Sequence, residues 1–210
     1  MGKVITFSNQ KGGSGKSTLS ANVAVLWSNS GYKVAVIDAD PQKSLTYWLS
    51  ERKKYYGADD IGIDFYNFDI RNLSEEIKKI KRKYDFIIID SPPAITFGTI
   101  QIIKASKGVF VPVQPSPLDL MATLPFLQIA REERKKPLII LNRVMPRARL
   151  TDAMILRLRY SGAKIARSRI SSKVIFAETY AVGRGVIDIN VTSDAAKEII
   201  NVGNEILRNL

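Results

Sequence analysis

The chain has 210 residues, of which 45% are hydrophobic, values that suit one globular domain with a sizeable core. It contains no cysteine and no histidine, which excludes disulfides, thiolate metal sites, iron–sulfur clusters and histidine-based catalysis, so any bound metal must use oxygen ligands. The net charge is +12, and residues 131–173 alone hold 13 basic and 3 acidic residues, an asymmetry that indicates a polyanionic partner.

Short apolar runs alternate with helical patterns along the chain. Going from the N-terminus, they predict a strand over 4–9, a helix over 17–29, a strand over 33–38, a helix over 74–83 and a strand over 84–90. They continue with a strand over 108–114, a helix over 118–135, a strand over 137–142 and helices over 151–160 and 193–207. Pro125 is expected to kink or break its helix, and residues 55–69 read as an irregular surface connection.

Apolar strands that alternate with helices predict an α/β fold, a mostly parallel twisted sheet with helices on both faces. No signal peptide and no run of roughly 20 apolar residues is predicted. We expect one domain over residues 1–210 that is not membrane-bound. Polar clusters follow the predicted strands, over residues 9–17, 38–42, 90–93, 114–119 and 142–143. Because ligands collect at the carboxyl ends of parallel strands, we expect one site there.

The first cluster is a phosphate-binding loop between a strand and a helix. Its residues are Lys11, Gly12, Gly13, Ser14, Gly15, Lys16, Ser17 and Thr18. The glycines let consecutive backbone N–H groups turn toward phosphate oxygens, and the following helix N-terminus adds positive partial charge. Lys16 can reach the β- and γ-phosphates, and the Ser17 hydroxyl can ligate Mg²⁺. The sequence therefore predicts a nucleoside triphosphate site.

Carboxylates follow the next two strands. Asp38 and Asp40 stand one residue apart at a strand end, so one can serve the metal and the other the attacking water. Asp90 closes the wholly apolar run before it, as does the acid that holds magnesium in phosphate-loop NTPases. We expect Ser17, Asp38 and Asp90 around the metal.

The K-G-G-x-G-K-S pattern, with Gln10 at the usual first glycine, resembles the deviant Walker-A class of P-loop NTPases. The D-x-D-P-Q stretch after residue 37 and the P-S-P-L-D stretch at 115–119 resemble ParA-type partition ATPases. The resemblance covers essentially the whole chain and implies catalytic roles for Lys11, Lys16 and Asp40. Lys11 would reach the partner subunit's nucleotide in an ATP-bound homodimer, and Asp40 would position the water.

GTP-binding folds read guanine with an acid in an N-K-x-D loop. The corresponding stretch here begins Asn142-Arg143 and places Met145 at the position of that acid, which favours ATP. By resemblance, Asn142 and Arg143 are the candidates for contact with adenine. The cofactors expected are ATP and Mg²⁺, and the absence of a histidine or glutamate base in the motifs predicts slow basal hydrolysis.

Branches of the superfamily that depend on cysteines, such as the nitrogenase iron protein, are excluded. MinD-type members bind membranes through a C-terminal amphipathic helix, whereas the final helix here has few basic residues and reads as packed on the core. ParA-type members bind DNA non-specifically as ATP dimers, and a ParB-like centromere-binding protein stimulates hydrolysis. The basic segment favours this branch. The candidate DNA contacts are Arg147, Arg149, Arg157, Arg159, Arg167, Arg169 and Lys173.

The resemblance thus implies a cytoplasmic, nucleoid-associated DNA partition ATPase. Two alternatives remain, a MinD-like membrane-associated regulator and a metabolic synthetase of the dethiobiotin type, which shares the fold.

Overall fold

The structure is a computed structural model that describes residues 2–57, 61–145 and 149–210. Its strands are β1 Lys3–Phe7, β2 Val34–Asp38, β3 Asp64–Tyr66, β4 Phe86–Asp90, β5 Gly108–Val113, β6 Leu138–Val144 and β7 Lys164–Ser171. Its helices are α1 Lys16–Asn29, α2 Ser44–Tyr56, α3 Leu73–Ile80, α4 Phe97–Ala105, α5 Pro117–Glu132, α6 Arg149–Tyr160, α7 Ile175–Ala181, α8 Val186–Ile189 and α9 Asp194–Arg208. A short 3₁₀ turn, η1, covers Ile70–Asn72.

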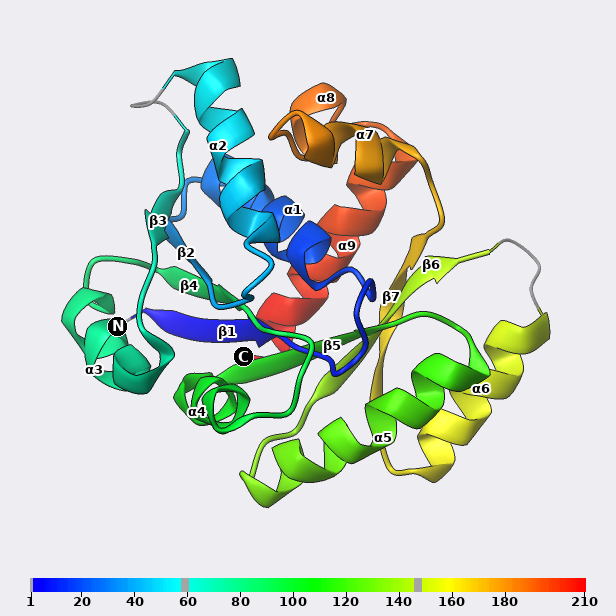
Figure 1. The fold of residues 1–210 in the computed structure, drawn as a ribbon. Coiled ribbons are helices and arrows are strands. Elements are labelled where there is room, and N and C mark those ends of the chain that lie inside the picture. Colours follow the sequence, from blue (N-terminus) through cyan, green and yellow to red (C-terminus); the bar gives the residue numbers. More distant parts are fainter. Residues whose placement is uncertain (1, 58–60, 146–148) are drawn as a thin grey trace.

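The strands form one seven-stranded sheet in the order β3-β2-β4-β1-β5-β6-β7, and every pair in it is parallel. Helices α1, α2, α7, α8 and α9 cover one face, and α3, α4, α5 and α6 cover the other (Figure 1). Neighbouring residues on a strand point to opposite faces. In β1, Ile5 and Phe7 therefore pack with α1 and α9, while Val4 packs toward α3. The predicted α/β fold is confirmed.

Two features near the expected elements differ from the sequence-based expectation. Helix α5 continues through Pro125 without a break. Pro125 is exposed, and so is Met121 one turn earlier, so the carbonyl left without a helical donor can bond to water. Residues 55–69 are not wholly irregular, because they include the end of α2 and the short strand β3.

The C-terminal helix α9 packs on the core, as expected. Its apolar face, with Ala196, Ile199, Val202 and Ile206, is buried against α1 and β7. Within the described ranges, no helix combines the length and the apolar character needed to cross a bilayer.

Candidate functional site

The loop between β1 and α1 lies at the carboxyl edge of the sheet, and its conformation depends on glycine. Gly13 and Gly15 have φ values of 72° and 99°, a left-handed region that side chains disfavour. A Cβ atom on Gly15 would also run into the amide of Asn142. The Asn142 amide nitrogen donates to the Ser14 carbonyl over 2.7 Å. The glycine and the asparagine thus fit each other across the site.

The loop carbonyls are held by side chains from other strand ends. Gln114, just after β5, donates to the Gly13 carbonyl over 2.8 Å. Among the described residues, no protein group accepts a hydrogen bond from the backbone N–H groups of residues 12–18. Consecutive free N–H groups at a helix N-terminus form an anion-binding concavity. This loop therefore fits a phosphate chain.

Lys16 begins α1 and is buried, with 5% of its surface exposed. Its ammonium donates to the Lys11 carbonyl over a long 3.4 Å. Burial lowers the pKa of Lys16, and the nearby Asp90 and Asp40 carboxylates oppose that shift. A buried cation with one weak hydrogen bond can accept phosphate oxygens as partners without losing strong contacts. Lys11 is half-buried and is not among the residues that line the two cavities described below.

Asp90 ends β4 and is wholly buried, and neither carboxylate oxygen has a hydrogen-bond partner. Burial raises its pKa to about 7; the Ser17 hydroxyl opposes this shift, and Asp38 adds to it. An unpartnered buried carboxyl beside a serine hydroxyl is an all-oxygen donor set, which suits Mg²⁺. Ser17 and Asp90 therefore fit the expected metal.

Asp38 and Asp40 have different surroundings. The Asp38 carboxylate accepts from the Asp40 N–H over 3.1 Å, from the Thr46 N–H over 2.8 Å and from the Thr46 hydroxyl over 2.7 Å. These bonds hold the turn before α2 and its first residues, so Asp38 already has a structural role. Asp40 accepts from the Gln42 N–H over 2.9 Å and lines the pocket at the phosphate loop. Asp40 is thus the acid that faces the space where phosphates would lie.

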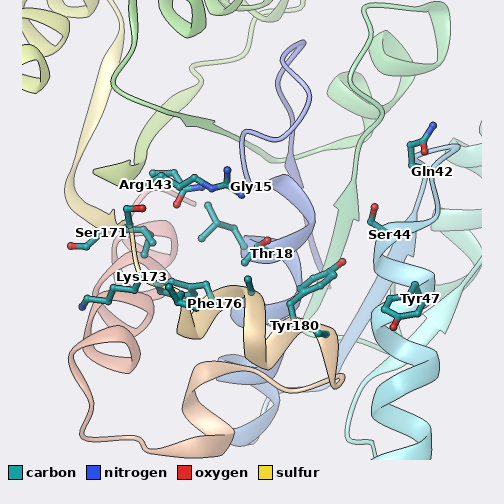
Figure 2. A pocket seen from close by; sticks show the side chains of 17 residues that line it. Gly15, Thr18, Gln42, Ser44, Tyr47, Arg143, Ser171, Lys173, Phe176 and Tyr180 are labelled. Atoms are coloured by element: carbon teal, nitrogen blue, oxygen red, sulfur yellow. The ribbon is translucent and has the colours of Figure 1, made fainter. Parts of the chain in front are cut away.

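Two connected cavities form the site. The smaller, of about 260 Å³, lies at the phosphate loop. The larger, of about 780 Å³, lies beside it, and Figure 2 shows the side chains that line this larger cavity. Six residues line both, namely Gly15, Thr18, Gln42, Ser44, Arg143 and Tyr180. No aspartate or glutamate is among the residues that line the larger cavity. One nucleotide could therefore place its phosphates in the first cavity and its base in the second.

Part of the larger cavity comes from residues that the sequence did not predict. The loop after β7 contributes Ser171, Ser172, Lys173 and Val174, and α7 contributes Phe176 and Tyr180. Had residues 164–171 been recognised as a strand, the rule that sites follow strand ends would have pointed to this loop. Arg143 lines both cavities as expected, whereas the Asn142 amide nitrogen is engaged with the phosphate loop.

The candidate DNA contacts fall into separate places. Arg147 lies outside the described residues, and only the backbone of Arg149 is described. Arg157 and Arg159 are exposed on α6, and Arg167 and Arg169 are exposed on the edge strand β7. Arg159, Arg167 and Arg169 line one hollow of about 280 Å³ between these two elements. We call Arg157, Arg159, Arg167 and Arg169 the edge arginines.

Lys173 is apart from the edge arginines. Its ammonium pairs with Glu198 over 2.8 Å, so part of its charge is neutralised within the chain.

A second basic feature lies at the amino ends of β5, β6 and β7, opposite the phosphate loop. We call it the basal cleft; it encloses about 670 Å³ and is lined by Lys107, Arg134, Lys135, Lys136, Lys164 and Arg208. Lys135 is structural, since its ammonium donates to the carbonyls of Lys104 and Ser106. The other five have no ion pair among the described residues. The sequence did not single out this cleft, because the fold gathers its cations from distant segments.

The free energy of unfolding without ligand is expected to fall as pH rises from about 4 to about 7. The pKa of Asp90 is raised from 3.8 to about 7, so between these values the folded state holds a proton that the unfolded chain releases. The loss should approach about 4 kcal/mol and level off above the folded-state pKa. Urea unfolding across this range, in EDTA, measures it.

The matched variant for this measurement is Asp90→Asn, which removes the titrating group. It should flatten the profile and raise stability most at about pH 8. Parallel profiles for the two proteins would show that Asp90 does not carry this pH dependence.

The sequence matches the CobQ/CobB/MinD/ParA nucleotide binding domain family over residues 5–186. The chain is 27% identical over 210 residues to the Maintenance of carboxysome distribution protein A of Halothiobacillus neapolitanus, covering 97% of this chain and 95% of that protein. It is 27% identical over 252 residues to the Sporulation initiation inhibitor protein Soj of Bacillus subtilis, covering the full length of both. The fold superposes on that of MinD from Pyrococcus horikoshii, solved with Mg-ADP, with a TM-score of 0.79 at 21% identity, over 98% of this chain and 96% of that one.

Proposed function

The chain belongs to the CobQ/CobB/MinD/ParA nucleotide-binding family, and from this premise we propose that it is an ATPase that positions a cargo on DNA. The observation that carries the ATPase assignment is the phosphate loop itself. Its free N–H groups and the buried Lys16 line one pocket, and the unpartnered carboxyl of Asp90 is buried close to Lys16 and Ser17 of that pocket. We take residues 1–210 to form a single ATPase domain.

Adenine is the base that the larger cavity favours. A guanine reader needs a carboxylate for the N1 and N2 donors of that base, and no acid within the described ranges lines this cavity. Its walls combine Phe176 and Ile170, which suit a planar ring, with the polar Ser171 and Ser172. Arg143, at the junction with the phosphate pocket, is placed for the ribose or base edge.

In this site the residues divide the work of hydrolysis. The loop N–H groups and Lys16 hold the phosphates and stabilise the charge that builds up as the γ-phosphoryl group leaves. Ser17 and Asp90 would hold Mg²⁺, which supplies further positive charge at the phosphates. Asp40 faces the phosphate pocket and would orient the attacking water. Neither histidine nor glutamate lines that pocket, in keeping with slow basal turnover.

The proposed active form is an ATP-bound homodimer. Lys11 is half-buried and lines neither cavity of its own subunit, so it is free to reach the nucleotide of a partner subunit. The dimer would bind DNA without sequence preference in a nucleoid-associated cycle. A ParB-like partner on the cargo would stimulate hydrolysis and release it. The relative from Halothiobacillus neapolitanus is named for the maintenance of carboxysome distribution, which supports a positioning role.

Electrophoretic mobility shift of non-specific duplex DNA tests this proposal. We expect binding with ATP and Mg²⁺, and little binding with ADP or without nucleotide. Affinity should fall with salt with a log–log slope of about −0.9 per phosphate contact. Equal binding in all three nucleotide states, or none at low salt, would remove the DNA-positioning function while leaving the ATPase intact.

The same assay locates the contacts. Arg169→Glu, in the edge arginines, should weaken binding about tenfold and reduce the salt slope by about 1. The matched control is Lys78→Glu, which makes the same charge change at an exposed site on α3. If both variants weaken binding equally, only the net charge matters and the edge arginines are not contacts.

A MinD-like membrane-associated regulator remains the second candidate, because the family to which the chain belongs includes MinD. The apolar side of α9 is occupied by the core, which disfavours a membrane-binding role for that helix. Sedimentation with anionic liposomes in ATP would reveal such binding if it exists.

A further inference from the structure

Tyr180, in α7, lies where the phosphate pocket meets the larger cavity. It lines both, together with Thr18 of α1 and Ser44 of α2. Figure 2 shows Thr18, Tyr47 and Tyr180 on three different helices around the cavity. Tyr47, by contrast, lines only the larger cavity and is 55% exposed. The two tyrosines therefore differ in one respect that can be tested, their access to the phosphates.

The Tyr180 hydroxyl is buried and has no hydrogen-bond partner among the described residues. A buried hydroxyl without a partner costs roughly 1–3 kcal/mol. Two other buried polar groups without partners lie at the same site, the Ser14 hydroxyl in the phosphate loop and the Asp90 carboxyl. Unpartnered groups that gather at one pocket indicate that a ligand supplies the missing partners.

The hydroxyl keeps its proton in this environment. Burial raises the pKa of Tyr180, and the Asp90 and Asp38 carboxylates raise it further, while the nearby Ser17 hydroxyl opposes the shift. The three carboxylates around it do not take that proton in a hydrogen bond. Asp38 is already bonded to Thr46 and Asp40, Asp40 accepts from Gln42, and Asp90 has no partner. The hydroxyl therefore has a proton that it can donate to a ligand in the phosphate pocket.

We propose that the Tyr180 hydroxyl donates a hydrogen bond to a phosphate oxygen of the bound nucleotide. This inference rests on the proposed ATP site and adds a residue that no part of the phosphate-loop pattern contains. Tyr180 belongs to α7, whereas the phosphates bind at the loop before α1. The contact therefore links the wall of the larger cavity to the phosphate chain. Tyr180 is thus a binding residue that contacts the phosphates in the same pocket as Lys16.

Tyr180→Phe tests the proposal, because it removes the hydroxyl and keeps the ring that packs near Trp48 at a centroid distance of 6.4 Å. The Kd for ATP with Mg²⁺, from isothermal titration, should rise about tenfold. The Kd for adenosine, which has no phosphates, should not change. Without ligand, the Tm of the variant should equal or exceed that of the parent, since an unpartnered group has been removed.

Tyr47→Phe is the matched control and should leave both Kd values unchanged. An unchanged Kd for ATP in Tyr180→Phe would overturn the proposal. So would a lower Tm without ligand together with equal losses for ATP and adenosine, because that pattern indicates a structural hydroxyl. If the parent protein itself fails to bind ATP, the proposed function fails and this inference with it. If the parent protein binds ATP and Tyr180→Phe binds ATP with the same Kd, this inference alone fails.

Discussion

Lys16→Ala is expected to abolish ATP binding at millimolar nucleotide. The buried ammonium has one long hydrogen bond, to the Lys11 carbonyl, and is otherwise available to the phosphates. A hydrogen bond to a charged group contributes roughly 1.5–3 kcal/mol, so loss of contacts to two phosphates should raise the Kd at least a hundredfold. Isothermal titration with ATP and Mg²⁺ measures this directly.

Lys197→Ala is the control, because Lys197 is an exposed lysine on α9, remote from the loop. It should bind ATP like the parent protein. Circular dichroism must show that Lys16→Ala is folded, since removal of the cation leaves Asp90 and Asp40 without their positive neighbour. A folded Lys16→Ala that binds ATP within about threefold of the parent would mean that the loop is not the phosphate site.

The phosphate loop was predictable because its chemistry is local. Glycines, a lysine and a serine at fixed spacing between a strand and a helix leave few other conformations, and the strand-end rule placed Asp38, Asp40 and Asp90 nearby. The residue pattern alone did not divide the work between Asp38 and Asp40, and only the resemblance assigned the attacking water to Asp40. That division depends on Thr46, whose N–H and hydroxyl occupy Asp38 and leave Asp40 toward the pocket.

The larger cavity, in which we propose that the base binds, was harder to predict because part of its wall comes from β7 and α7. Residues 164–171 alternate arginine with small and apolar residues, a pattern that indicates a basic surface more clearly than a strand. The segment is both: an edge strand whose Arg167 and Arg169 are exposed while Ile170 is buried. Since only one side of an edge strand is paired, charged residues are common there, and they mask the apolar pattern.

Contacts between distant segments could not be predicted from the sequence either. The fit of Asn142 against Gly15 joins residues 127 positions apart in the chain, and the basal cleft gathers its cations from β5, the end of α5, β7 and α9. A single sequence carries no signal for such pairs. Composition showed where the positive charge lies along the chain, but only the fold places Lys107 and Arg208 in the same cleft.

Asp40→Ala is expected to keep ATP binding and to lose hydrolysis. Asp40 lines the phosphate pocket, and among the described residues its carboxylate accepts one hydrogen bond, from the Gln42 N–H, so its removal should disturb the fold little. Without an acid to orient the water, turnover should fall roughly a hundredfold or more, while the Kd for ATP stays within about twofold. Because the ATP state persists, the dimer should accumulate, which size-exclusion chromatography with light scattering can detect.

Asp38→Ala provides the contrast that makes this result specific. Its carboxylate accepts three hydrogen bonds that hold the start of α2, so its loss should lower the free energy of unfolding by about 2–4 kcal/mol. Asp40→Ala should lower it by less than about 1 kcal/mol. Asp152→Ala, at an exposed acid on α6, should change neither hydrolysis nor assembly. If Asp40→Ala hydrolyses ATP at the parent rate while Asp38→Ala is stable but inactive, the two acids have the reverse roles, and Asp38 orients the water.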